Sequence, residues 1–308
     1  MKNILLYYYN LNPTDIHQKD DIYFFKINDE RYFVYPVIRN NNEIKEIFEI
    51  NRELINKNIP VHQIILNKQN NILIQFNSIN YILLKSCIKS NRIINSDDIV
   101  YLESNTPIVK SDSSLYRSNW INLWERKNDY LEYQISQFGI NYPIVVEHFA
   151  YYIGLAENAI IYAKNTDIDV KPNFMDTPVI CHKRITNNTN LFDLFNPLEF
   201  VIDHKVRDIA EYIKFKFFYN KVNLWEEIYM YFSSNNLSLY GARMFYARLL
   251  YPTYFFDKYD EILDGTSTEK ELLPIIKQQE EYEEFLVDIY NFIKLKYEIP
   301  EIEWLMKK

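Results

Sequence analysis

The feature of this sequence that most constrains its fold is a change near residue 90 from strand-like to helix-like residue patterns. Before that point, short aromatic and β-branched runs alternate with turn-forming residues, a pattern typical of antiparallel strands. The predicted strands are Ile4–Tyr9, Ile22–Ile27, Arg31–Ile38, Val61–Leu66, Ile72–Phe76 and Tyr81–Ile88. One segment in this half, residues 42–58, instead carries its apolar residues at helical spacing, and Pro60 ends it.

The rest of the chain is predicted to be mostly helical. The predicted helices are Tyr116–Phe138, Pro143–Ala163, Val206–Tyr219, Leu224–Asn235, Ser238–Leu250 and Glu269–Leu295. Two short extended pieces, Thr177–Ile185 and Phe200–Asp203, lie among them. This order predicts an α+β fold with residues 1–90 as an N-terminal β-rich lobe, 91–112 as a connector and 113–308 as a C-terminal helical lobe.

Composition excludes several classes of protein. The chain has 34 Lys and Arg against 42 Asp and Glu, and this net charge of −8 argues against nucleic acid as a partner. Cys87 and Cys181 are too few and too far apart for a disulfide scaffold or a zinc site. The most apolar long stretch, residues 149–163, contains Glu157 and Asn158. We therefore expect a cytoplasmic chain with no signal peptide and no membrane insertion.

Chemistry is indicated most strongly where the apolar strand 200–203 ends in a carboxylate. Asp203 stands at the strand end, and a predicted helix begins directly after it. A carboxylate in that position suits a hard cation such as Mg²⁺. It suits a helix-capping role equally well, so both interpretations of Asp203 stay open.

A second polar segment lies about twenty residues upstream of Asp203. The extended piece 179–185 contains His182 and is followed by the polar residues 186–190. A histidine at a strand end, a polar loop and then a strand ending in Asp form the layout of a kinase catalytic loop and metal loop. With no second histidine nearby, a structural role for His182 is favoured over a metal ligand.

Several stretches of the helical half resemble a known group of proteins. They are Trp120–Glu132 (WINLWERKNDYLE), Tyr151–Ile160 (YYIGLAENAI), Asp203–Ile213 (DHKVRDIAEYI), Leu237–Pro252 (LSLYGARMFYARLLYP) and Ile299–Leu305 (IPEIEWL). The chain resembles the kinase-like superfamily of aminoglycoside and choline phosphotransferases. Within it, the resemblance is closest to the spore-coat CotS and YutH group of Firmicutes, on the YutH-like side.

That resemblance implies a two-lobed protein-kinase-like fold, with a small antiparallel β lobe containing one helix and a larger helical lobe. It implies Mg²⁺ and ATP as the candidate cofactors, although the sequence assigns no nucleotide-binding residue. It also implies synthesis in the mother-cell cytoplasm, deposition on the spore coat and other spore coat proteins as partners.

The catalytic loop departs from the pattern that phosphoryl transfer requires. The family places an Asp two residues after the histidine as the proton acceptor, but Arg184 stands two residues after His182. An arginine cannot act as a base. Thr189 occupies the place of the Asn that binds the second metal ion, and Asn188 or Asn190 could serve only if the loop were shifted.

The N-terminal half lacks the groups that hold nucleotide phosphates. The predicted strand 31–38 has no internal lysine, so Glu46, Glu49 and Glu53 on the following helix lack the partner that the family would supply. No glycine precedes Gly139, so a glycine-rich phosphate loop cannot form. These losses predict a catalytically degenerate chain in which only Asp203, as a vestigial metal ligand, is in register.

The leading hypothesis is a binding or structural role in spore coat assembly or sporulation. One alternative is a working small-molecule phosphotransferase that uses Asp203 and Asn188, and another is a pseudokinase that binds nucleotide without turnover. The aromatic stretch 240–256 is predicted to be core packing, and the acidic run 280–284 is predicted to be a solvated helix face. Exposed tyrosines could suit packing into a protein layer.

Overall fold

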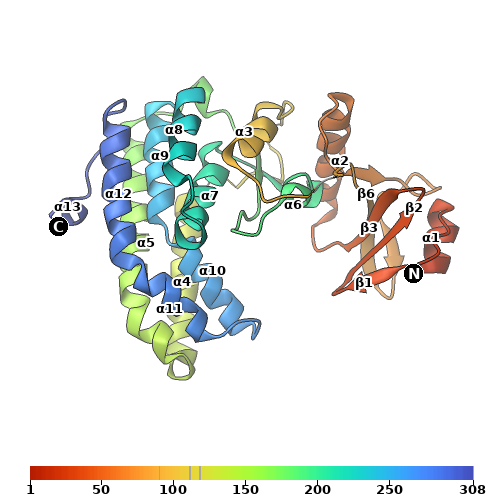
Figure 1. Ribbon diagram of the computed structural model, residues 1–308, viewed down its shortest axis with the longest axis horizontal. Helices are drawn as coiled ribbons and strands as arrows, with labels where there is room; N and C mark the ends of the chain where they lie inside the picture. The colour runs from red at the N-terminus through yellow and green to blue at the C-terminus, as the bar shows by residue number, and fades with distance from the viewer. Residues whose placement is uncertain (90, 111, 118, 308) are drawn as a thin grey trace. The chain divides into compact units, whose positions relative to one another are not determined.

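The computed structural model describes residues 1–89, 91–110, 112–117 and 119–307. The chain divides into two compact units (Figure 1). The N-terminal unit comprises residues 1–116 and 188–202, and the helical unit comprises residues 117–187 and 203–308. The first contains an antiparallel sheet and the second is built mainly from helices, so the predicted α+β fold class is confirmed.

The sheet of the N-terminal unit is antiparallel throughout. Its strands are β1 (His17–Lys19), β2 (Ile22–Ile27), β3 (Glu30–Pro36), β4 (Gln63–Ile65), β5 (Ile74–Phe76) and β6 (Ile79–Lys85). They follow the order β1-β2-β3-β6-β4, and β5 pairs with β6. Alternation along the strands sends one set of side chains into a core made of Leu5, Phe25, Tyr32, Val34, Ile74, Tyr81 and Leu83.

The predicted strand Ile4–Tyr9 is wrong, because these residues belong to helix α1 (Lys2–Tyr9). The apolar run is too short for its periodicity to separate a strand from a helix. The helix buries Leu5 in the core of the sheet and ends at Asn10, which adopts the left-handed conformation at φ 58°. Strand β1 was not predicted, since its three residues are all exposed.

The N-terminal unit extends beyond the predicted boundaries at residues 90 and 112. It includes α2 (Asn41–Asn56), α3 (Ser96–Ser104), α6 (Leu191–Leu194) and β8 (Phe200–Asp203) up to residue 202. Helix α3 lies within the predicted connector. Arg39 donates hydrogen bonds to the carbonyl oxygens of Leu198 (3.0 Å) and Phe200 (2.6 Å), which tie the later segment to the N-terminal unit.

The helical unit contains one short strand, β7 (Val179–His182). Its main helices are α4 (Trp120–Phe138), α5 (Pro143–Asp169), α7 (Val206–Tyr219), α8 (Leu224–Ser234), α9 (Leu239–Leu250), α10 (Thr253–Leu263), α11 (Leu273–Lys277), α12 (Gln279–Lys294) and α13 (Glu303–Met306). The predicted helix 269–295 is wrong as a single element, because Pro274 can stand only in the first turn of a helix and α11 begins around it. Helix α10 was not predicted.

Aromatic side chains form much of the core of the helical unit, as predicted for residues 240–256. Phe245, Tyr246 and Phe255 are fully buried. The rings of Tyr152 and Phe255 stack with their centroids 3.7 Å apart. The tyrosines that are exposed among the described residues are Tyr7, Tyr101, Tyr130, Tyr133, Tyr219 and Tyr229.

Helix α5 is long and apolar enough to cross a membrane, and it is the one such helix among the residues described. Its buried side chains include Leu155, Ala156, Ala159 and Ala163, which pack inside the helical unit. A core helix of a soluble protein has the same length and composition. Cys87 and Cys181 are both free thiols.

Candidate functional site

His182 is fixed by the first turn of helix α7. Its backbone amide donates to both carboxylate oxygens of Asp208, at 3.0 and 3.1 Å, and its ring Nδ1 lies 2.6 Å from Asp208 Oδ2. Both residues are almost fully buried. The ring is therefore oriented by a buried carboxylate, and the structural role of His182 stays a prediction.

Asp203 is completely buried, and its side chain is hydrogen-bonded by groups of the helical unit. The indole Nε1 of Trp120 donates to both carboxylate oxygens, at 3.0 and 2.9 Å, and the amide of His204 donates to Oδ1 at 2.7 Å. Arg207 Nη1 lies 2.5 Å from Oδ2. A carboxylate held by two neutral donors and a guanidinium is already neutralised and hydrogen-bonded without a metal ion.

Asp203 does not cap helix α7, because the N-cap residue is Lys205 and no side-chain hydrogen bond of that residue caps this helix. The amide of Val206, the first residue of α7, donates to Nδ1 of His204 at 3.2 Å. Nε2 of the same ring lies 3.0 Å from Asp176 Oδ1, so Nε2 carries the proton. Burial would raise the pKa of Asp176, but hydrogen bonds from His204 and Ser238 outweigh it and lower the pKa.

Arg207 connects the two polar clusters described above. Besides Asp203, its guanidinium donates to the carbonyl oxygens of His182 (3.1 Å) and Lys183 (3.2 Å). The end of β7, the start of α7 and Asp203 are thus held together by one buried cation. This network holds His182 of the predicted degenerate catalytic loop together with Asp203, the possible vestigial metal ligand.

Arg184, at the position of the missing proton acceptor, forms an ion pair with helix α10. Its Nη2 lies 2.6 Å from Asp257 Oδ1, and the Arg184 side chain remains about half exposed. Burial raises the pKa of Asp257 to about 6, against the lowering effect of the guanidinium. A carboxylate therefore does lie beside the predicted position, but it comes from a distant segment and is paired with a cation.

A second buried ionic cluster supports the same helices from the interior. Glu211 accepts hydrogen bonds from Lys214 Nζ (3.1 Å), Arg248 Nε (2.7 Å) and Thr253 Oγ1 (2.5 Å). The Arg248 guanidinium also lies 4.6 Å from the ring centroid of Trp120. The cluster is structural, because each of its charged groups is paired inside the helical unit.

In the N-terminal unit, strands β1 and β2 are joined by a tight turn. Lys19 pairs with Ile22, so only Asp20 and Asp21 form the turn. A glycine-rich loop would present backbone amides to phosphates, whereas this turn presents two carboxylates.

Glu46, one of the helix residues predicted to lack a partner, is bound to the segment after α3. It accepts hydrogen bonds from the hydroxyl groups of Ser113 and Ser114 and from the Ser114 amide. Burial would raise the pKa of Glu46, but these bonds lower it overall. Glu46, one of three candidate partners for a lysine on β3, thus binds the segment after α3 instead.

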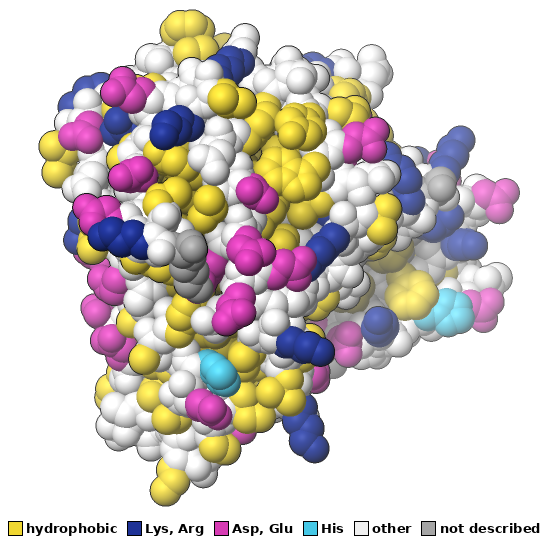
Figure 2. Space-filling model, turned by 60° about the vertical axis from the view of Figure 1, so that its left-hand side comes forward, with side chains coloured by type: hydrophobic (Ala, Val, Ile, Leu, Met, Phe, Trp, Pro, Cys, Tyr) yellow, Lys and Arg dark blue, Asp and Glu magenta, His cyan; other side chains and the backbone are white. Residues whose placement is uncertain are grey.

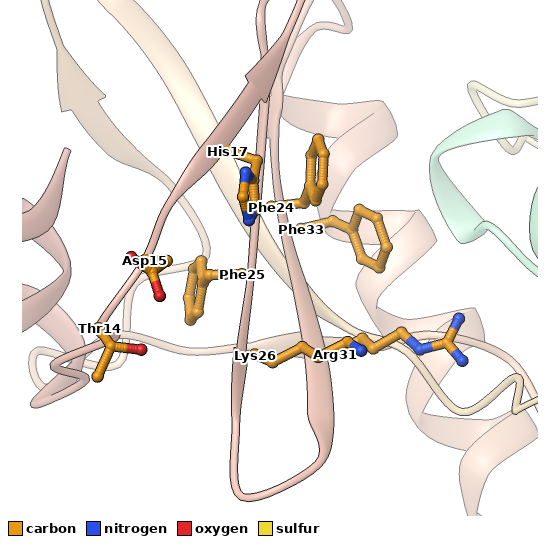
Figure 3. Close-up of a pocket in the computed structure, with 8 residues that line it drawn as sticks. All are labelled: Thr14, Asp15, His17, Phe24, Phe25, Lys26, Arg31 and Phe33. Carbon is orange, nitrogen blue, oxygen red and sulfur yellow. The ribbon is translucent and has the colours of Figure 1, made fainter.

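A pocket of about 350 Å³ lies in the N-terminal unit at the edge of the sheet (Figure 3). His17, Phe24 and Phe33 are opposite one another on β1, β2 and β3, and the ring centroids of His17 and Phe24 are 5.4 Å apart. Lys26 and Arg31 extend near the β2–β3 turn. The pocket is also lined by the Asp15 carboxylate, so its charged side chains are of both signs.

The sheet face next to this pocket is covered by a side chain from α6. Phe192 packs on Phe33 with ring centroids 4.5 Å apart, and His62 lies 4.2 Å from Phe192 on the other side. None of these aromatic residues was predicted to lie at a site. The alternation of aromatic residues along β2 and β3 was the available signal, but strand pairing was needed to place them together.

The remaining predicted loop residues lie in the N-terminal unit. Asn190 caps α6, accepting from the amides of Phe192 (2.9 Å) and Asp193 (3.2 Å), and the Thr189 carbonyl accepts from Ile94 at 3.2 Å. Asn188 belongs to the same unit. Across residues 1–89, 91–110, 112–117 and 119–307, no group of three or more His, Cys, Asp or Glu side chains could hold a metal ion.

Comparison with known proteins identifies the fold and the family. An aminoglycoside phosphotransferase from Alicyclobacillus acidocaldarius is similar with a TM-score of 0.68 and 11% identity, covering 93% of this chain and 94% of that one. Spectinomycin phosphotransferase is similar with a TM-score of 0.59 and 13% identity, covering 95% and 97%. At this identity the likeness shows the two-lobed fold alone.

Sequence comparison is more specific. The endospore coat-associated protein YutH of Bacillus subtilis is 29% identical over 211 aligned positions, and the alignment covers 61% of this chain and 61% of that protein. The family described as "Spore coat putative kinase YutH" matches residues 2–289. The match covers nearly the whole chain, and the chain therefore belongs to the YutH family of spore coat kinase-like proteins.

Proposed function

We propose that this chain is a catalytically degenerate kinase-like protein that acts by binding within the spore coat. The observation that carries the proposal is the environment of Asp203. A metal-binding carboxylate has to present its oxygens to the ion, whereas Asp203 has no exposed surface and binds Trp120, His204 and Arg207.

The rest of the site supports the same proposal. Arg184 stands where the resemblance to phosphotransferases puts the proton acceptor, and Asp20 and Asp21 form the turn between β1 and β2. The described residues do not fit a magnesium nucleotide, because the candidate ligand is sequestered and the turn carries the charge of the wrong sign.

The family supplies the setting of the proposed role. The relative from Bacillus subtilis is named as an endospore coat-associated protein. We extend that setting to this chain: synthesis in the mother-cell cytoplasm, followed by deposition on the forming spore with other coat proteins as partners. Neither nucleic acid nor membrane insertion is part of the proposal.

The proposal predicts where a tagged copy appears in the native host. The fusion should be absent during vegetative growth, appear in the mother cell during sporulation and collect as a shell around the forming spore. Fluorescence microscopy through a synchronised sporulation, with the untethered tag as control, measures this. An even cytoplasmic signal that begins in vegetative cells would contradict the proposal.

One observation favours the second candidate, a working small-molecule phosphotransferase. Asp257 has its pKa raised to about 6 by burial and lies against Arg184. If Arg184 moved away, Asp257 would be a carboxylate of suitable basicity near the predicted catalytic position. A titration of the chain with Mg-ATP distinguishes this candidate from the first.

A further inference from the structure

A groove of about 780 Å³ runs along the outer face of helix α12 in the helical unit. We call it the α12 groove. It is lined by Glu280, Glu284, Asp288, Val287, Leu305 and Met306, among others. Figure 2 shows the side of the molecule that carries α12 and α13, where acidic side chains gather next to hydrophobic ones. The sequence predicted a solvated helix face for the acidic run 280–284.

The exposed carboxylates of the groove follow one line along the helix. Glu280, Glu284 and Asp288 are spaced four residues apart, so they stand on one face at steps of about 6 Å. No Lys, Arg or His among the described residues forms an ion pair with any of the three. Glu281, one residue away, is instead paired with Lys221 at 2.5 Å.

The floor of the groove is apolar and fixed. Leu305 is 1% exposed, while Val287 and Met306 are half-buried. Helix α13 packs against α12 and supplies two of these side chains. Glu283 lies beneath the surface, 3% exposed, and accepts a hydrogen bond of 2.6 Å from the Tyr151 hydroxyl. The groove thus combines a preformed apolar base with a row of exposed negative charges.

We propose that the α12 groove binds a cationic amphipathic helix of a partner protein. Lys or Arg side chains at i, i+4 and i+8 of such a helix would match the spacing of Glu280, Glu284 and Asp288. An apolar side chain between them would pack on Val287 and Met306. This is the helix-in-groove mode of recognition, and the charge complementarity selects a basic partner.

The geometry excludes a metal ion as the occupant. Three carboxylates one turn apart on a straight exposed helix cannot converge on one cation, which needs its oxygen ligands within about 2.5 Å. The proposal goes beyond a binding role in the coat, because it names a surface and a class of partner. Its test uses the purified full chain without nucleotide, so its failure would leave the proposed function standing.

The probe is a designed fluorescent peptide of about 18 residues, five helical turns, with Lys at i, i+4 and i+8 and Leu between them. Fluorescence anisotropy with the full-length chain should show saturable binding that weakens as salt is raised. The triple variant Glu280→Lys, Glu284→Lys and Asp288→Lys should bind at least about 10-fold more weakly. A peptide with Glu in place of Lys should not bind.

The matched control places the same charge change elsewhere on the helical unit. Asp129→Lys, Glu132→Lys and Glu147→Lys alter exposed residues outside the groove and give the same net charge, so this variant should keep wild-type affinity. A second groove variant, Val287→Asp, should weaken binding without reversing the charge row. Circular dichroism establishes that all variants are folded.

Three results would overturn the proposal. Absence of saturable binding to the wild-type chain is the first. The second is an equal loss of peptide affinity in the groove triple variant and the control triple variant, because binding would then depend only on the net charge of the chain. The third is a concentration-dependent dimer of the wild-type chain that the groove variant abolishes, which would make a second copy of this chain the occupant.

Discussion

Glu211→Leu is expected to lower the free energy of unfolding by about 3–5 kcal/mol, because it leaves two buried cations without their counterion. Lys214 has no exposed surface and Arg248 is 3% exposed, and both donate to Glu211. Urea unfolding followed by tryptophan fluorescence measures the change. For a unit of this size, it corresponds to a fall of roughly 10 °C in the unfolding midpoint.

The pH dependence of the same site gives an independent check. Burial would raise the pKa of Glu211, but Lys214 and Arg248 outweigh it and lower the pKa to about 2. A carboxyl whose folded pKa lies below its unfolded pKa stabilises fully above the unfolded value of about 4.5, and this contribution is lost as the pH falls towards 2. The difference in free energy of unfolding between wild type and Glu211→Leu should therefore become smaller at acidic pH.

The control for Glu211 is Glu303→Leu, which removes an ion pair with Lys307 in which both side chains are about three-quarters exposed. It should leave the unfolding curve unchanged within error. Two results would contradict the structural role assigned to this cluster. One is a loss of unfolding free energy in Glu211→Leu no larger than in Glu303→Leu. The other is a difference in unfolding free energy between wild type and Glu211→Leu that grows at acidic pH.

Asp203→Asn is expected to destabilise the chain by about 3 kcal/mol in the absence of any nucleotide or metal ion. The substitution keeps an oxygen that can accept from Trp120 but removes the charge that pairs with Arg207. Thermal and urea unfolding of the purified variant in a buffer containing EDTA measures the effect.

A structural role and a metal-binding role of Asp203 predict opposite effects of Asp203→Asn on the stability of the metal-free chain. A carboxylate whose role is to bind a metal ion is unsatisfied when the ion is absent. Replacing it by a neutral amide would then leave the metal-free chain as stable as wild type, or more stable. The control is Asp169→Asn, which affects an exposed partner of Arg243 and should change little. Stability of Asp203→Asn equal to wild type would contradict the structural role and restore the metal-ligand interpretation.

Long periodic segments of the fold could be predicted, and short or irregular ones could not. Val206–Tyr219 was predicted with the boundaries that the structure gives, because its apolar spacing is unbroken and a strand directly precedes it. The run 4–9 failed because six apolar residues fit a strand and a helix equally well. Residues 188–202 belong to the N-terminal unit, where Arg39 donates hydrogen bonds to carbonyl oxygens of this segment. Such long-range contacts cannot be predicted from a local sequence pattern.

For the site, the sequence identified positions but not partners. His182, Arg184 and Asp203 were found because strand ends and loop order are local features. Asp257 lies 73 residues from Arg184 and Trp120 lies 83 residues from Asp203, so neither contact could be anticipated from spacing. These partners determine whether the carboxylates are available for chemistry.

Isothermal titration of the full-length chain with Mg-ATP tests the central claim most directly. We predict no saturable heat that depends on Mg²⁺ and no release of phosphate, while an active aminoglycoside phosphotransferase titrated in parallel binds normally. Saturable Mg²⁺-dependent binding with turnover would contradict the account and make the chain a working kinase. Binding without phosphate release would leave it a pseudokinase that holds nucleotide, contrary to the sequestration of Asp203.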